Sequence, residues 1–228
     1  MKLFLTSAGI VPEIRDEFLK FLDKKPQDCR LVFISTAIKP ENAEWFIQFV
    51  QKDKQRLAVL NFIIQEVDLE NETKGSLQSK FADADIVYVE GGNTFYLLDR
   101  ARKSGFTAAV KKFLERGGVY AGVSAGSMIA GINIESANWE PPDDNIIGLD
   151  NFSAMHLVGF VITPHYCAKV ADAISEAAAK IDYPVVALTD QQAVLVEGDE
   201  IEIIGPGKKT IFNSKFLETK TDFMGQRA

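Results

Sequence analysis

The sequence contains very few histidine and cysteine residues. Its 228 residues include only two of each, and no Cys-x-x-Cys pair is present. Two histidines cannot supply a three-histidine zinc site, and we expect neither a metal nor another cofactor. Because Cys29 and Cys167 lie far apart in the chain, a reduced, cytoplasmic protein is the expectation.

Long apolar runs and an excess of positive charge are also missing. No apolar stretch reaches the roughly 18 residues of a membrane span, and the apolar N-terminal run from Leu3 to Leu5 is too short for a signal peptide. The formal net charge of −7 argues against nucleic acid as a main partner. With 46% hydrophobic residues, the chain can bury one sizeable core. We therefore expect a single α/β domain over residues 1–228.

Short apolar runs alternate with helical patterns along the chain. The predicted strands lie at 3–5, 31–34, within 59–67, and at 85–89, 118–123, 160–162 and 185–188. The predicted helices lie at 14–22, 45–50, 95–101, 106–114 and 170–181, and the segment 194–203 is typical of a hairpin. Apolar strands that alternate with amphipathic helices indicate parallel βαβ units. The sequence therefore predicts an α/β fold with a doubly wound, mostly parallel sheet and a small C-terminal β-hairpin.

The turn around Ser124 carries the most specific motif. Residues 122–126, Gly-Val-Ser-Ala-Gly, match the G-x-S-x-G nucleophile elbow, after an apolar strand and before a helical stretch of small residues. Such a turn points the Ser124 hydroxyl out at the carboxyl end of the sheet. The Ala125 N–H then lies at a helix N-terminus, where it can stabilise developing negative charge. An ordinary strand-to-helix turn is the structural alternative, but the context favours a nucleophile.

A serine nucleophile needs a base, and histidine suits neutral pH best. His165 follows the strand at 160–162, at the same sheet edge as Ser124 if the sheet is parallel. His156 precedes that strand and is expected near the opposite edge. We therefore predict His165 as the base. The alternative for either histidine is a partly buried side chain satisfied by local hydrogen bonds.

The base in turn needs an acidic partner. Asp190 ends the strand at 185–188 and so obeys the same edge rule. Carboxylates of the loop after the elbow compete with it: Glu140, Asp143, Asp144 and Asp150. Asp190 is the first choice for the third member of the triad, and simple solvation is the alternative for the loop carboxylates.

A glycine pair follows the strand at 85–89, in the turn Glu90-Gly91-Gly92-Asn93-Thr94. Two glycines there allow backbone N–H groups to turn toward a bound carbonyl oxygen. Many ordinary strand-to-helix turns also need glycine, and the turn matches neither the dinucleotide nor the Walker motif. We predict that Gly91, Asn93 and Thr94 contact the substrate.

Taken together, these motifs resemble peptidase family S51, the family of dipeptidase E and cyanophycinase. The matching segments are 89–98, 121–127, 163–166 and 187–190, in the family's order and at similar spacing. The resemblance covers residues 1–207 and implies a flavodoxin-like fold related to class I glutamine amidotransferases. It implies Ser124 as nucleophile, His165 as base and Asp190 as acid. It also implies an oxyanion hole formed by Gly92 and Ala125.

The expected function is that of a cytoplasmic serine peptidase, which hydrolyses small peptides through an acyl-enzyme on Ser124. An esterase or amidase with the same triad, and a catalytically inactive flavodoxin-like binding module, are the alternatives. A preference for an N-terminal aspartyl residue lacks support, because Lys169 and Lys180 are the only basic residues between His165 and Asp190.

The oligomeric state does not follow from the sequence. A homodimer is compatible with it, and Trp45, Phe46 and the segment from Phe212 to Phe223 could contribute to a subunit contact. Burial of these aromatic side chains in the core would explain them equally well.

Overall fold

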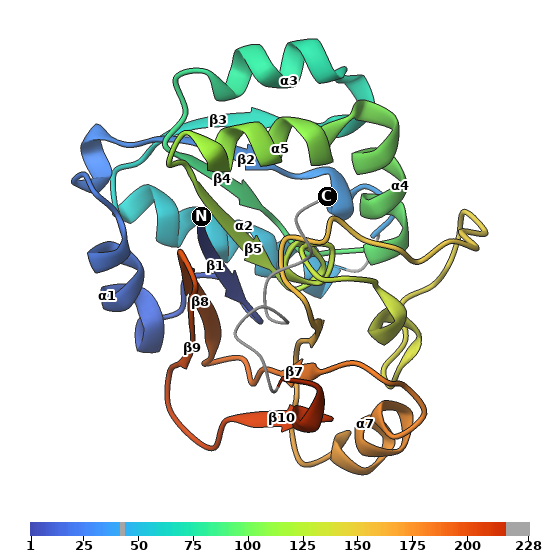
Figure 1. Cartoon of the computed structure of the whole chain (residues 1–228). Helices are drawn as coiled ribbons and strands as arrows, with labels where there is room; N and C mark the ends of the chain where they lie inside the picture. Colours follow the sequence, from blue (N-terminus) through green and yellow to red (C-terminus); the bar gives the residue numbers. More distant parts are fainter. Residues whose placement is uncertain (42–43, 218–228) are drawn as a thin grey trace.

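The fold is organised around a seven-stranded sheet. The computed structural model describes residues 1–41 and 44–217, and within them the strand order is β3-β2-β4-β5-β1-β8-β9 (Figure 1). The strands are β1 (Lys2–Thr6), β2 (Arg30–Ile34), β3 (Ile63–Val67), β4 (Ile86–Val89), β5 (Val119–Val123), β8 (Ala193–Glu197) and β9 (Glu200–Ile204). The first five run parallel, whereas β8 is antiparallel to β1 and β9 to β8. The mostly parallel sheet and the C-terminal hairpin are confirmed.

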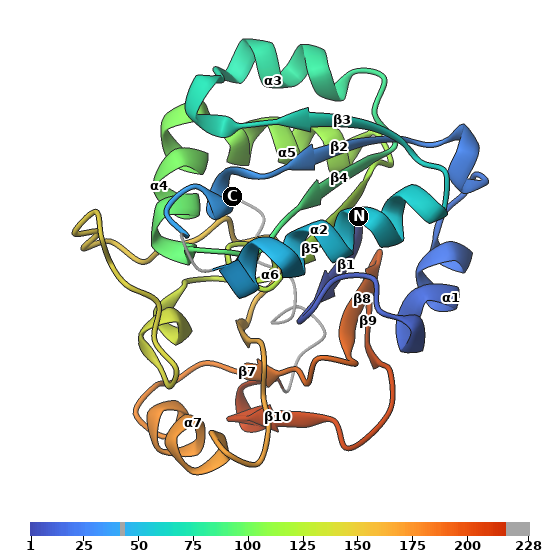
Figure 2. The same ribbon diagram turned by 180° about the vertical axis from the view of Figure 1, so that it is seen from behind.

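Helices cover both faces of this sheet. On one face lie α1 (Pro12–Phe21) and α2 (Glu44–Val59), and on the other lie α3 (Lys74–Phe81), α4 (Thr94–Ser104) and α5 (Phe106–Glu115) (Figures 1 and 2). Alternate residues of β4 serve the two layers: Tyr88 packs toward α1 and α2, and Val87 and Val89 pack toward the other helices. Because both faces are buried, the central strands are apolar throughout.

A second, smaller sheet corrects the predicted topology. Its order is β10-β7-β6, with β6 (Val161–Thr163) parallel to β7 (Val185–Ala187) and β10 (Thr210–Phe212) antiparallel to β7. The strands predicted at 160–162 and 185–188 therefore form, but not in the large sheet. Together with α7 (Ala171–Ala178), they lie below the carboxyl end of β1 in Figure 1. The sequence could not reveal this, because short apolar strands carry no label of the sheet they join.

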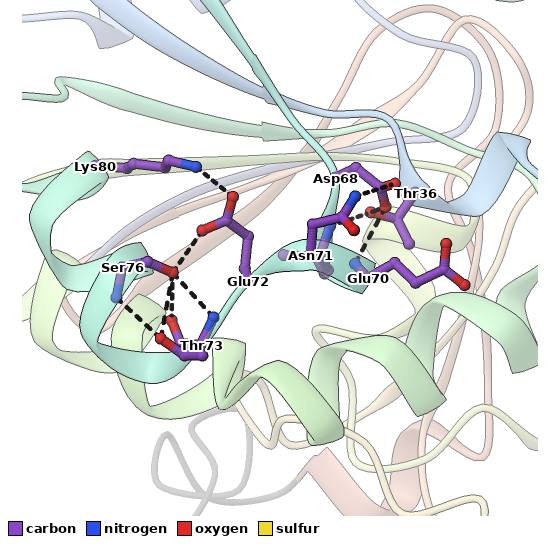
Figure 3. Close-up of polar contacts among 9 residues, drawn as sticks. Thr36, Asp68, Glu70, Asn71, Glu72, Thr73, Ser76 and Lys80 are labelled. Carbon is purple, nitrogen blue, oxygen red and sulfur yellow. Dashed lines mark hydrogen bonds and ion pairs between the residues drawn. The ribbon is translucent and has the colours of Figure 1, made fainter.

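Helix α3 is absent from the sequence prediction. Only Leu77 and Phe81 of this helix are buried, so its apolar pattern is short. Its start is defined instead by a capping box, in which the Thr73 hydroxyl accepts the Ser76 N–H and the Ser76 hydroxyl accepts the Thr73 N–H (Figure 3). Glu72 accepts a further hydrogen bond from Ser76 and pairs with Lys80.

Figure 3 also shows the hydrogen bonds that fix the segment after β2 to the segment after β3. The Thr36 hydroxyl donates to Asp68 Oδ1 over 3.1 Å and accepts the Leu69 N–H over 2.8 Å (Figure 3). These bonds join two short 3₁₀ segments, Thr36–Ile38 after β2 and Leu69–Asn71 after β3. The first of them carries the backbone against which the Gly92 turn packs.

Two expectations about surfaces have different outcomes. No helix within the described ranges is long and apolar enough to cross a membrane. The predicted subunit contact stays a prediction: residues 218–223 and the side chains of Trp45 and Phe46 lie outside what the structure describes. Phe212 packs in an edge-on contact with Tyr166, with ring centroids 6.1 Å apart.

Candidate active site

Ser124 occupies a sharp turn between β5 and α6 (Ala125–Met128). Its backbone has φ 46° and ψ −109°, a strained conformation for a residue with a side chain. The turn is anchored because the Ser124 N–H donates to Thr6 O over 3.0 Å, which continues the pairing of β5 with β1. The sharp strand-to-helix turn predicted from the motif is present.

The two glycines of the motif allow close backbone approach. A Cβ on Gly126 would lie 2.1 Å from the Val89 carbonyl oxygen, and a Cβ on Gly122 would lie 2.7 Å from the Gly126 carbonyl oxygen. No side chain fits at either position. The first turn of α6 therefore lies directly on the end of β4.

The imidazole of His165 meets the Ser124 hydroxyl. Ser124 Oγ and His165 Nε2 are 3.0 Å apart, within hydrogen-bond reach. His165 follows β6 of the small sheet and has a φ of 56°. The structure thus brings Ser124 and His165 together, as predicted. However, the strand before His165 belongs to the small sheet and not to the large sheet on which the prediction was based. His156 lies in a contact with Ser153, whose Oγ is 3.0 Å from His156 Nε2.

Asp190 completes a chain of three side chains. Its Oδ1 lies 2.6 Å from His165 Nδ1, so the imidazole bridges the carboxylate and Ser124. The hydrogen bond from His165 lowers the pKa of Asp190 below its usual value, against the opposing effect of burial. The carboxylate is consequently ionised at neutral pH and able to stabilise an imidazolium.

The competing loop carboxylates take other positions. Asp143 accepts the Thr94 N–H over 2.9 Å at the start of α4, and burial raises its pKa. Glu140, Asp144 and Asp150 make no hydrogen bond or ion pair with His165 within the described residues. Among the carboxylates weighed from the sequence, Asp190 is the one in contact with the imidazole.

Ser7 is a site residue that the sequence prediction missed. Its buried hydroxyl donates to Asp190 Oδ1 over 2.9 Å and accepts the backbone N–H of His165 over 2.8 Å. It follows β1, so it lies at the carboxyl edge of a parallel strand next to β5. The edge rule could have identified it, because a hydroxyl directly after the first strand is a candidate on that rule alone.

The glycine pair after β4 lies between Ser124 and the 3₁₀ segment after β2. A Cβ on Gly91 would lie 3.1 Å from the Ser124 Cβ, and one on Gly92 would lie 2.3 Å from the Ala37 carbonyl oxygen. Gly92 has a φ of 133°, which glycine adopts readily. Neither the Gly92 N–H nor the Ala125 N–H donates to another residue within the described part of the chain.

Asn93 and Thr94 use their polar groups mostly within the protein. The Asn93 side chain caps α4 by accepting the Tyr96 N–H and donates to the Asp144 carbonyl oxygen over 2.8 Å. The Thr94 hydroxyl points toward the Met128 sulfur, 3.6 Å away. These contacts tie the 143–144 loop to the turn. Direct substrate contact by either side chain stays a prediction.

The chain is similar to known proteins over most of its length. The profile of peptidase family S51 matches residues 3–204. An uncharacterized peptidase of Pasteurella multocida strain Pm70 (PM1590) is 32% identical over 217 residues, which cover 91% of this chain and 99% of that protein. A protein named peptidase E from Shewanella denitrificans is 28% identical, over 89% of this chain and 85% of its own.

A solved structure has the same fold. The 1.5 Å crystal structure of a candidate peptidase E protein from Listeria monocytogenes EGD-e superposes with a TM-score of 0.75 at 25% identity, over 90% of this chain and 98% of that one. Matches of this extent define the class: the protein is a peptidase and a serine hydrolase. More particularly, the chain belongs to peptidase family S51, and the family resemblance predicted from the motifs is confirmed.

Proposed function

We propose that the protein cleaves small peptides through an acyl-enzyme on Ser124. The single observation that supports this most strongly is the unbroken chain from Ser124 Oγ through His165 to Asp190, with contacts of 3.0 and 2.6 Å. Such a chain is what activates a serine hydroxyl at neutral pH. On this proposal Ser124, His165 and Asp190 are the catalytic residues.

The steps follow from the atoms in contact. His165 Nε2 accepts the Ser124 proton as Oγ attacks the peptide carbonyl carbon, and Asp190 stabilises the imidazolium. The imidazolium then protonates the leaving amine as the C–N bond breaks. Water then gives a proton to the same imidazole as it attacks the acyl carbon. The imidazolium returns that proton to Ser124 Oγ as the bond between the acyl carbon and Oγ breaks, which releases the acid and restores the enzyme.

The oxyanion of each tetrahedral intermediate needs donors that are already oriented. We assign this role to the N–H groups of Gly92 and Ala125. Ala125 follows Ser124 in the chain, Gly92 follows Gly91, which packs against Ser124, and neither N–H donates to another described residue. Each donor of this kind is worth roughly 10²–10³ in turnover in serine peptidases. Gly91, Asn93 and Thr94 would line the same side of the bound peptide.

The decisive test is a panel of dipeptides, longer peptides and isopeptides offered to the wild type and to Ser124→Ala. We expect turnover of short peptides by the wild type and none above background by the variant, with unchanged thermal unfolding. Ser136→Ala is a suitable control, because this buried hydroxyl lies outside the triad and bonds to the Ile162 carbonyl oxygen. Retained hydrolysis in Ser124→Ala would contradict the assignment.

An esterase or amidase that uses the same three residues is the alternative. The same panel, extended with aminoacyl esters and simple amides, separates the two: the proposal requires higher kcat/KM for peptides than for amides that lack a second amino acid. A fluorophosphonate probe tests the third possibility, since a binding module without an activated serine would leave Ser124 unlabelled. We keep the cytoplasm as the proposed location, supported by two free cysteines, Cys29 and Cys167.

A further inference from the structure

Two carboxyl groups lie buried directly behind the site. Asp53 of α2 and Glu90, the residue after β4, both have 0% of their surface exposed. Buried carboxyls are rare, because an ionised group without solvent needs compensation. Neither residue belongs to the catalytic chain of the proposed mechanism, so their burial needs a separate explanation.

The two carboxyls depend on each other. They contact one another, and no aligned N–H or hydroxyl donor among the described residues reaches either oxygen of Glu90. Asp53 has more support, since it accepts the Tyr88 hydroxyl, and Arg56 Nη1 lies 3.5 Å from its Oδ1. Two carboxyls can hydrogen-bond only when one of them carries a proton.

The balance of charge around Asp53 and Glu90 also indicates that the pair carries one proton. Lys54, the other cation that faces the pair, is already paired with Glu66 over 2.8 Å. With both carboxyls ionised, the guanidinium of Arg56 would therefore leave a buried negative charge uncompensated. With one proton between them, the pair and Arg56 are neutral together. Burial and the neighbouring Asp53 raise the pKa of Glu90 well above its usual range. Burial raises the pKa of Asp53 as well. Because Asp53 accepts the Tyr88 hydroxyl and pairs with Arg56, whereas the Glu90 oxygens have no such donor among the described residues, the shared proton is assigned to Glu90, which then donates to Asp53.

The pair also touches both turns that form the site. A Cβ on Gly9 would lie 2.2 Å from Asp53 Oδ1, so Asp53 packs against the turn that carries Ser7. Arg56 Nη1 donates to the Ala8 carbonyl oxygen in the same turn over 3.3 Å. Glu90 directly precedes Gly91, which packs on Ser124.

We propose that Asp53 and Glu90 share one proton and, as a pair, position the Ser7 turn and the Gly91–Gly92 turn around Ser124. Both are positioning residues, and this inference rests on the proposed function. If Glu90 loses its proton, two anions face each other, and the Gly91 N–H, which already approaches the Glu90 carboxyl, becomes its nearest donor. Rotation of that peptide would displace the oxyanion turn. The other charged and titratable groups that face the pair are Tyr88 from β4 and Arg56 and Lys54 from α2.

Stability as a function of pH tests the shared proton without any reference to activity. The pKa of Glu90 is raised in the folded protein, so above its usual value of 4.5 the unfolded chain releases a proton that the folded chain keeps. As the pH rises above 4.5, the unfolding constant of the wild type should therefore increase relative to that of Glu90→Gln, by up to about tenfold per pH unit. The exposed Glu115→Gln controls for loss of a carboxylate. If the ratio of the wild-type unfolding constant to the Glu90→Gln unfolding constant stays the same between pH 5 and 8, the two carboxyls do not share a proton.

Positioning is tested by the rate at which a fluorophosphonate labels Ser124, together with kcat and KM on the best peptide. Glu90→Gln keeps a donor to Asp53 and should stay within about threefold of the wild type. Glu90→Met has similar volume but no donor, and labelling and kcat should fall by at least about tenfold, with a smaller change in KM. If Glu90→Met does not fold, Asp53→Asn is used instead, because it removes the carboxylate that pairs with Arg56. The same fall in labelling rate and kcat is expected for this variant.

The outcomes separate this inference from the proposed function. Wild-type labelling rates in Glu90→Met or Asp53→Asn would overturn positioning. A wild type that is labelled but cleaves no peptide would refute the proposed substrate class and leave the ranking of the variants intact. A wild type that is never labelled would overturn the nucleophile and its positioning together, whereas the pH dependence of stability would still decide the shared proton.

Discussion

Ser7 and Asp190 are joined by a 2.9 Å hydrogen bond, in which the Ser7 hydroxyl donates to the same carboxylate oxygen that faces His165. The hydroxyl also accepts the His165 N–H, so one buried side chain holds both the Asp190 carboxylate and the backbone of His165. The two residues are 183 positions apart in the chain. This link connects the turn after β1 with the segment between β7 and β8, and hence the large sheet with the small one.

Ser7→Ala should therefore slow peptide turnover without abolishing it. Loss of a hydrogen bond to an ionised group costs about 1.5–3 kcal/mol, so we expect kcat to fall by about tenfold or more and KM to change little. Steady-state kinetics on the best peptide would measure this. Ser104→Ala is the matched control, because that buried hydroxyl donates to the Ala101 carbonyl oxygen of its own helix, α4, and lies outside the candidate site. Equal effects of the two substitutions would contradict the role of Ser7.

Asp190→Asn should be far more damaging than Asp143→Asn. An amide at Asp190 can no longer stabilise the imidazolium or impose its tautomer, and kcat is expected to fall by roughly 10⁴-fold. Asparagine at position 143 keeps an oxygen that can accept the Thr94 N–H, so less than about a tenfold change is expected. The reverse order in kcat would show that the loop after the elbow supplies the third member.

The lowered pKa of Asp190 predicts a specific pH dependence of stability. The folded-state pKa lies below the usual 3.8, so the His165 contact stabilises the fold above that value and the effect is lost as pH falls through the folded pKa. The difference in unfolding free energy between the wild type and Asp190→Asn should be constant near neutral pH and shrink below pH 3.8. It should be small, because 62% of the Asp190 side chain is exposed. Urea unfolding between pH 2.5 and 7 would measure it; a difference that grows on acidification would contradict the prediction.

Gly126→Ala should destabilise the protein, and Gly75→Ala should not. The new Cβ at Gly126 would lie 2.1 Å from the Val89 carbonyl oxygen, and strain of this kind costs about 1–3 kcal/mol or more. At Gly75 in α3 the nearest atom would be the Thr73 Oγ1 at 3.9 Å, so alanine should be neutral or stabilise by up to about 1 kcal/mol. Thermal unfolding measures both. A Gly126→Ala protein as stable as the wild type would show that the elbow tolerates a side chain.

Features with a local physical cause, such as the apolar strands and the turn at Ser124, could be predicted from the sequence. The alternation of apolar strands and helices predicted the large sheet, because strands buried on both faces must be apolar. The G-x-S-x-G motif predicted the turn at Ser124, because close backbone approach excludes side chains at Gly122 and Gly126. Helix α3 was missed because it buries only Leu77 and Phe81 and owes its start to a capping box.

His165 lies next to Ser124, as the sequence predicted, but the strand before it does not belong to the large sheet, as the prediction had assumed. With two histidines in the whole chain, the sequence by itself nearly determined which imidazole could face Ser124. It could not determine that β6 and β7, which carry His165 and Asp190, form a separate sheet with β10. Strand partners are chosen by contacts between distant segments, and a short apolar run is compatible with several of them.

The sequence on its own therefore determined the class of fold and the family, and it selected Ser124 as the candidate nucleophile, since these follow from local patterns and spacing. Only the tertiary structure decided what surrounds Ser124. Ser7 beside Asp190, and Asp53 against Glu90, are each brought together by strand order and helix packing. The physical reason is that hydrogen bonds and shared protons act over a few ångströms in space, whatever the distance along the chain.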